Sequence, residues 1–221
     1  MRITIESTIP AGAGLSSSTA LTTALLLAFD ASPTPELVLQ AEVAATGVPG
    51  GLMDQYAILY GTRGHALLLD CASRAFDPLA IPTSTAFVVI DTGTRRALAD
   101  GRYAQRRAEV EAGEPKRVRH AESEQARVYA AAETLGDPDE LGRIISASHR
   151  SLRDDFEVSS PELDEAVARA ESLKGCTGAR LVGAGFAGCV LAVAHTDEAE
   201  NISNAFAQAW VVHAVDGASE L

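Results

Sequence analysis

Residues 9–20 read Ile-Pro-Ala-Gly-Ala-Gly-Leu-Ser-Ser-Ser-Thr-Ala, a glycine-rich turn followed by three serines. Gly12 and Gly14 allow a tight turn and a close approach of the backbone to a bound group, because neither carries a Cβ. A serine among residues 16–18 can cap the helix predicted over residues 19–28. The free N–H groups and positive dipole end of such a helix suit a phosphate. An ordinary helix start is the alternative at this point.

The composition places the chain among water-soluble globular proteins. It has 221 residues, of which 47% are hydrophobic and 22% charged, enough for one large domain or two small ones. The net charge of −12 argues against a partner that is nucleic acid or an anionic membrane. Cys71, Cys176 and Cys189 are odd in number and lack metal-ligand spacing, which predicts reduced thiols in the cytoplasm.

Hydrophobic periodicity, prolines and glycines predict alternating helices and strands. A half-buried strand is expected over residues 1–8, and the Arg and Glu runs of residues 119–153 are expected on solvated helix faces. The other expected helices cover 35–45, 52–60, 119–135, 138–153 and 197–208, with two more beginning near 101 and 160. The other expected strands cover 65–71, 74–81, 86–91, 189–195 and 210–215. Residues 82–85, Pro-Thr-Ser-Thr, are the best candidate for a domain boundary.

Two further stretches bear on the meaning of the first. Residues 47–57 read Gly-Val-Pro-Gly-Gly-Leu-Met-Asp-Gln-Tyr-Ala and place Asp54 at the start of a short helix. There Asp54 is either a simple complement to the helix dipole or a functional acid. Residues 178–188 contain four glycines between two predicted strands. They form either a hairpin turn or a wall where the backbone approaches a ligand.

These stretches together resemble the GHMP kinase superfamily. Residues 9–20 are similar to its Pro-x-Gly-x-Gly-Leu-Ser-Ser-Ser-Ala phosphate loop, and residues 178–188 to its C-terminal glycine motif. Residues 47–57 resemble the Gly-x-x-x-Gly-Ile-Met-Asp-Gln segment of the galactokinase family, and residues 146–167 resemble the same family almost throughout. The order of the motifs along the chain is also that of the superfamily.

The resemblance implies an α+β fold with two domains. Its N-terminal part, residues 1–83, would be ribosomal-protein-S5-like and N-terminally truncated, and its C-terminal part, residues 84–221, ferredoxin-like. The implied activity is ATP-dependent phosphorylation of galactose at the anomeric hydroxyl, with ATP and Mg²⁺ as cofactors. Galactose and ATP would then be the partners, with no nucleic acid or membrane involved.

The same resemblance assigns roles to individual residues. The ATP phosphates would be cradled by Gly12, Gly14, Leu15, Ser16, Ser17 and Ser18, with the Ser17 hydroxyl facing Mg²⁺. Asp54 would accept the proton of the attacking sugar hydroxyl. The sugar would be lined by Gly51 and Tyr103, and the reacting centre bordered by Gly183, Gly185 and Gly188.

Two departures from the galactokinase pattern leave other functions open. The motif Gly-Arg-x-Asn-Leu-Ile-Gly-Glu-His-x-Asp, which supplies sugar ligands and an arginine, does not occur in this sequence, so a missing N-terminal segment would be supplied elsewhere. Ala184 and Ala187 stand where the family usually has glycine. The alternatives are a non-catalytic nucleotide-binding or regulatory paralogue and another GHMP small-molecule kinase, acting on homoserine or mevalonate.

Overall fold

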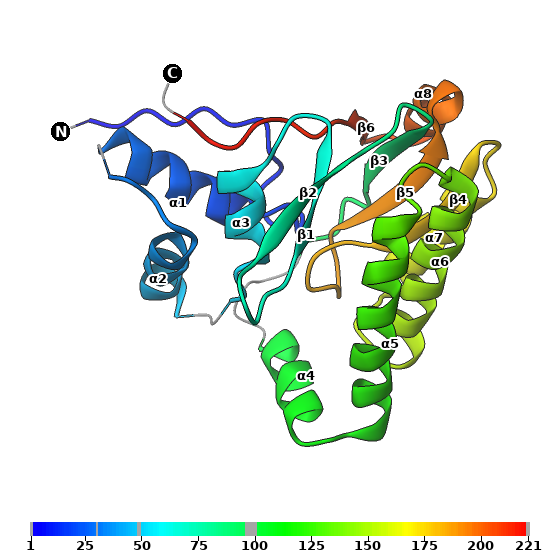
Figure 1. Cartoon of the computed structure of the whole chain (residues 1–221), viewed down its shortest axis with the longest axis horizontal. Helices are drawn as coiled ribbons and strands as arrows, with labels where there is room; N and C mark the ends of the chain where they lie inside the picture. Colours follow the sequence, from blue (N-terminus) through cyan, green and yellow to red (C-terminus); the bar gives the residue numbers. More distant parts are fainter. Residues whose placement is uncertain (1, 30, 48–49, 96–100, 220–221) are drawn as a thin grey trace.

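Three short helices and a β-hairpin make up the first region of the computed structural model, residues 2–80 (Figure 1). The structure describes residues 2–29, 31–47, 50–95 and 101–219. The helices are α1 (Ser17–Ala28), α2 (Pro35–Thr46) and α3 (Met53–Tyr60). The hairpin pairs β1 (His65–Leu69) antiparallel with β2 (Phe76–Ala80).

Local chemistry explains the bounds of α2. The Thr34 hydroxyl accepts a hydrogen bond from the Leu37 N–H at 3.2 Å, and Pro35 occupies the first turn, where its missing N–H is no loss. Gly47 ends the helix with a φ of 69°, a left-handed conformation that glycine adopts readily.

An antiparallel sheet of four strands is the centre of the second region, residues 85–212. Its strands stand in the order β4-β5-β3-β6, so the sheet shares no strand with the hairpin. Their bounds are β3 (Thr85–Asp91), β4 (Cys176–Leu181), β5 (Cys189–His195) and β6 (Ala209–Val212). The register places Phe87 opposite Val193 on one side and Val212 on the other.

Helices of the second region pack on this sheet and enclose the main core. The helices are α4 (Arg102–Glu111), α5 (Pro115–Glu133), α6 (Pro138–Asp154), α7 (Pro161–Glu171) and α8 (Ala199–Asn204), the last preceded by a short 3-10 turn, η1 (Thr196–Glu198). Val88, Leu163 and Ile202 are fully buried within the core. Figure 1 shows α4 at the end of α5, away from the sheet.

Close contact between α6 and β4 explains one glycine of the second glycine-rich stretch. Gly178 lies inside β4, and a Cβ there would stand 2.0 Å from the carbonyl oxygen of Gly142 in α6. Gly178 therefore serves helix–strand packing, and the loop proper comprises residues 182–188.

The C-terminal residues return to the first region. The Ala218 N–H donates to the Ile58 carbonyl at 2.8 Å, and Asp216 forms an ion pair with Arg63 at 3.1 Å. This tail joins the two regions at the C-terminal end of α3. Among the described residues, no helix combines the length and the apolar content that crossing a membrane requires.

Three expectations need correction. Residues 2–8 of the expected first strand are in no sheet, because no described strand lies alongside them, and Ile3 and Ile5 are 51% and 58% exposed (Met1 lies outside the described residues). The helix expected over 197–208 ends at Asn204, because the Asp91 N–H binds the Gln208 carbonyl and so draws the chain into the sheet. The acidic and basic residues of α5 do not all face solvent, as described below.

Candidate active site

The first glycine loop leads into α1, whose N-terminus has no side-chain cap. Gly12 and Gly14 have φ values of 70° and 76°, and Ser16 is also left-handed with a φ of 55°. Ser16 occupies the N-cap position of α1 but makes no side-chain cap hydrogen bond. The first N–H groups of α1 are therefore available to an anion.

The second glycine loop lies directly against the first. A Cβ on Gly188 would stand 2.6 Å from the Ala13 carbonyl oxygen, and one on Gly183 would stand 3.0 Å from the Gly14 carbonyl oxygen. Ala13 itself is fully buried by this contact. The fold thus brings together two glycine loops that are separated by about three quarters of the sequence.

The alanines of the second loop fit its conformation. Neither Ala184 nor Ala187 has a positive φ, whereas Gly183, Gly185 and Gly188 all do. Because a methyl group is strained only at a positive φ or in a close contact, the loop tolerates both alanines.

A carboxylate that sequence analysis missed connects the three helices of the first region. Glu42 of α2 accepts hydrogen bonds from the Ser18 hydroxyl at 2.7 Å and the Thr19 hydroxyl at 3.0 Å. Its other oxygen accepts from the Gln55 side-chain amide at 2.7 Å. The signal in the sequence was a lone acid among the apolar residues 37–45 of a predicted helix. Its partners, however, lie elsewhere in the chain.

Asp54 stands beside this cluster at the start of α3, next to Gln55. Its carboxylate is partly exposed and has no hydrogen bond or ion pair within the described ranges. Gly51 just before it is exposed, with no heavy atom within 4 Å of the position that a Cβ would take. This end of α3 is therefore open to a ligand.

Tyr103 lies apart from the glycine loops in sequence, on a helix of the second region. It lies in α4, is 45% exposed and forms no hydrogen bond to either glycine loop in the part of the chain described. Its neighbour Arg102 does reach the second loop, because the Arg102 guanidinium lies 4.1 Å from the ring centroid of Phe186.

The buried Arg117 binds the segment, residues 157–158, to which the second glycine loop is hydrogen-bonded. The Phe186 N–H donates to the Val158 carbonyl at 2.6 Å, and the preceding residue, Glu157, is held in a left-handed conformation with a φ of 54°. Arg117 donates to Glu157 at 2.6 Å and to Glu109 of α4 at 2.7 Å. The hydrogen bond from Arg117 to Glu157, and another to Glu157 from Lys116, lower the pKa of Glu157 to about 2.

The three thiols are unpaired, in agreement with the sequence-based expectation. Burial raises the pKa of Cys176 to about 11 and that of Cys189 to about 12. Neither thiol is therefore a nucleophile at neutral pH. Among the described residues, no group of three or more His, Cys, Asp or Glu side chains is placed to hold a metal ion by itself.

Comparison with known proteins assigns the family. The model of the GHMP kinases N terminal domain matches residues 1–62, and that of the GHMP kinases C terminal domain matches residues 128–212. The chain belongs to the GHMP kinase family. This GHMP kinase chain is 37% identical to a galactokinase of Roseiflexus over 93% of its own length, and 36% identical to human galactokinase over 85%.

Solved structures agree with the family and with the α+β fold. Lactococcus lactis galactokinase complexed with galactose superposes with a TM-score of 0.84 at 26% identity, covering 96% of this chain and 69% of that one. Leishmania major mevalonate kinase has the same fold, with a TM-score of 0.64 at 22% identity, covering 94% of this chain and 67% of that one. The chain spans 63% of the length of the Roseiflexus galactokinase and 57% of the human one.

Proposed function

We propose that this GHMP kinase chain transfers the γ-phosphoryl group of ATP to the anomeric hydroxyl of galactose. The observation that carries the proposal is the contact between the two glycine loops next to the uncapped end of α1, where Glu42 links α1 to α3, the helix that carries Asp54. Such a transfer needs positioning and charge neutralisation more than covalent chemistry. Two apposed loops and an open helix end provide the positioning.

The nucleotide would lie on the first loop. Backbone N–H groups contributed by Gly12, Gly14, Leu15, Ser16, Ser17 and Ser18 would hold the phosphates, as anions are held at helix N-termini. Gly183, Gly185 and Gly188 would close the reacting centre from the second loop. The absence of a lysine from residues 9–20 is consistent with recognition by backbone groups.

The oxygen atoms near α1 suit a magnesium ion, which prefers carboxylate and hydroxyl ligands. The Ser17 hydroxyl has no hydrogen-bond partner among the described residues, and Glu42 accepts a hydrogen bond from the hydroxyl of the next residue, Ser18, at 2.7 Å. Gln55 is 3% exposed, and its Oε1 also lacks a partner there. We therefore assign Mg²⁺ to Ser17 and Glu42. The ion would neutralise phosphate charge during transfer.

Asp54 would act as the general base on the sugar. Its open carboxylate would accept the proton of the anomeric hydroxyl, while Gly51 would leave room for the ring and Tyr103 of α4 would line the bound sugar. The similarity to a galactokinase that binds galactose supports this assignment of the sugar. This chain matches 63% of the Roseiflexus galactokinase and 57% of the human one. We propose that a segment corresponding to the unmatched part of these relatives completes the sugar site.

Two further proposals concern organisation and location. A boundary between residues 83 and 84 is supported by the separation of the hairpin from the four-stranded sheet. A cytoplasmic location is supported by the three unpaired thiols.

One observation supports the non-catalytic alternative. No cationic side chain pairs with Asp54 within residues 2–29, 31–47, 50–95 and 101–219. A base that lacks an opposite charge loses a group that would orient it. A chain that binds ATP and does not turn it over would accord with this observation.

Release of ADP from Mg-ATP with and without galactose tests the proposal. Replacing Asp54 by Asn should lower galactose-dependent release by about 10²- to 10⁴-fold, the usual contribution of a general base. Asp77→Asn, a change of an exposed carboxylate in β2, is the matched control and should leave the rate unchanged. Release that depends on mevalonate or homoserine instead would contradict the sugar assignment. ATP binding without release would favour the non-catalytic alternative.

A further inference from the structure

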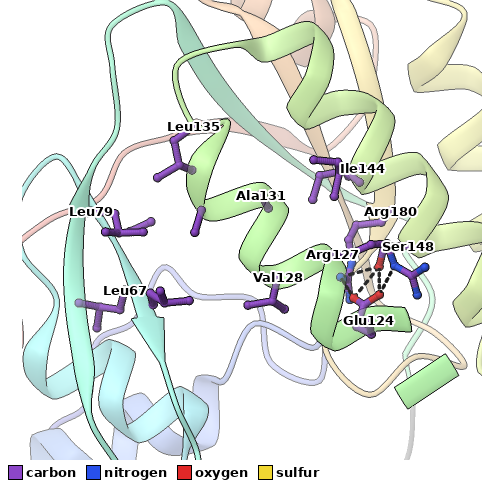
Figure 2. A pocket seen from close by; sticks show the side chains of 14 residues that line it. Leu67, Leu79, Glu124, Arg127, Val128, Ala131, Leu135, Ile144, Ser148 and Arg180 are labelled. Atoms are coloured by element: carbon purple, nitrogen blue, oxygen red, sulfur yellow. Dashed lines mark hydrogen bonds and ion pairs between the residues drawn. The ribbon is translucent and has the colours of Figure 1, made fainter. Parts of the chain in front are cut away.

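A cavity of about 200 Å³ lies between the hairpin and helices α5 and α6 (Figure 2). Its apolar wall includes Leu67, Leu79, Val128, Leu135, Ile144 and Ile145. Asp54 and the two glycine loops are not part of its lining, so the proposed phosphoryl transfer does not use it. A dry cavity of about 150 Å³ accommodates benzene, so this one has room for a single ring with a short substituent.

One end of the cavity is charged. Figure 2 shows Glu124, Arg127, Ser148 and Arg180 gathered there, away from the leucines of the hairpin. Arg180 Nη1 donates to Glu124 at 2.7 Å and to Ser148 at 2.8 Å. Arg127 Nε donates to the other Glu124 oxygen at 2.7 Å. The Arg and Glu side chains expected on a solvated face of α5 thus line a cavity here.

This end of the cavity carries one surplus positive charge. Burial raises the pKa of Glu124, but Arg180 and the hydrogen bonds from Ser148 and Arg127 outweigh burial, so the pKa lies below its ordinary value. The carboxylate is therefore ionised at neutral pH. Two guanidinium groups face this one carboxylate, and the Arg127 and Arg180 side chains are only 18% and 26% exposed.

Donors remain for a ligand. An arginine side chain has five N–H groups. Within the part of the chain that the structure describes, Arg127 Nη1 and Arg180 Nη2 have no hydrogen-bond partner. Partly desolvated guanidinium groups bind carboxylates strongly and with defined geometry.

We propose that this cavity binds a small carboxylate with a compact apolar body, whose head group accepts hydrogen bonds from Arg127 and Arg180. The apolar wall would hold a phenyl or branched alkyl group. A cation with the same body would meet the surplus positive charge, and a fully polar anion such as a sugar phosphate would leave the apolar wall unfilled. Charge and shape therefore select the same class of ligand.

The position of the cavity suggests a regulatory role. Arg180 Nε donates to the carbonyl of Leu181 at 3.1 Å, and Leu181 is the last residue of β4 before the second glycine loop. The hairpin on the opposite wall follows α3, which carries Asp54. A bound carboxylate would contact both regions and bias how the loops meet. Only this regulatory step rests on the proposed function.

Direct binding to the full chain in the absence of nucleotide tests the site, so its outcome is independent of kinase activity. Phenylacetate is the probe, and phenethylamine has the same ring with the opposite charge. Titration calorimetry should give saturable phenylacetate binding with a dissociation constant at least about tenfold lower than that of phenethylamine. Equal affinities, or no binding of phenylacetate, would overturn the proposal.

Three variants locate the binding. Arg127→Gln should weaken phenylacetate binding by about tenfold or more, because it removes a charge-assisted hydrogen bond. Val128→Trp should abolish binding by filling the cavity, and because Val128 is 42% exposed, the larger side chain should leave the fold intact. Arg143→Gln, on an exposed face of α6, should change nothing. Binding that survives Val128→Trp in a folded protein would place the ligand elsewhere and refute the site.

Discussion

The two regions of the chain contain very different amounts of core. All members of the buried core cluster lie between residues 86 and 202, in the sheet and its helices. The first region buries few apolar side chains and leaves Phe29 52% and Met53 61% exposed. Since hydrophobic burial dominates folding free energy, the second region should carry most of the stability of the chain.

The difference matters because one glycine loop belongs to each region. The first loop is held by the contact of Ala13 and Gly14 with Gly188 and Gly183, so its shape depends on the second region. The second loop is anchored from within its own region by Val158 and Phe186. Substitutions at corresponding places in the two regions should therefore have unequal effects.

The largest expected effect comes from adding a methyl group to each loop. In Gly185→Ala, a Cβ would stand 2.2 Å from the Val158 carbonyl oxygen at a φ of 78°. We expect the free energy of unfolding to fall by about 3 kcal/mol, from left-handed strain and backbone displacement together. In Gly12→Ala the nearest atom is the flexible Arg95 side chain at 3.5 Å, so only the strain of about 1–2 kcal/mol applies.

Urea unfolding followed by circular dichroism measures both losses. Equal losses would mean that the second loop can move away from Val158, and the anchoring inferred for it would be wrong.

A smaller effect is expected from removing the same two methyl groups in each region. Val88 in β3 and Val38 in α2 are both fully buried, but only Val88 belongs to the core cluster. Val88→Ala should lower the free energy of unfolding by about 2–3 kcal/mol, because strands on both sides prevent collapse of the cavity. Val38→Ala should lower it by about 1 kcal/mol, because the sparse packing around α2 can relax. Equal losses in urea unfolding would contradict the difference between the regions.

Features governed by local chemistry were predictable from the sequence. The serine cap and proline that begin α7 and the turn between β1 and β2 lie within a few residues of what they determine. The assignment of the two glycine loops and Asp54 to a site rests on a resemblance, whose residue types are distinctive in order and spacing, and it stays a prediction.

Features governed by distant partners were not predictable in this way. Residues 2–8 alternate like a strand, but a strand exists only where another lies beside it. Glu42 draws its hydrogen bonds from α1 and α3, and Glu124 pairs with Arg180 from β4. A helical pattern specifies which residues share a face and leaves open which partner covers that face.

The smallest expected effect on stability comes from removing the charge of Glu157, next to the residue that holds the second loop. Glu157 is 42% exposed and accepts hydrogen bonds from Arg117 and Lys116, which lower its pKa from 4.5 to about 2. Because the folded protein holds this carboxylate ionised, its contribution is full above pH 4.5 and is lost as the pH falls toward 2. Glu157→Gln should therefore lower the free energy of unfolding by about 0.5–1 kcal/mol at pH 7, and the difference from the unmodified chain should vanish toward pH 2.

Glu165→Gln, on the exposed face of α7, is the matched control for this titration and should leave stability unchanged at every pH. Urea unfolding at pH 7, 4.5 and 3 follows both variants. A Glu157→Gln difference that stays constant down to pH 3 would show that the side chain supports Val158 and the second loop through its shape. The ion pairs with Arg117 and Lys116 would then contribute little, and the anchoring of the loop would rest on the backbone hydrogen bond from Phe186.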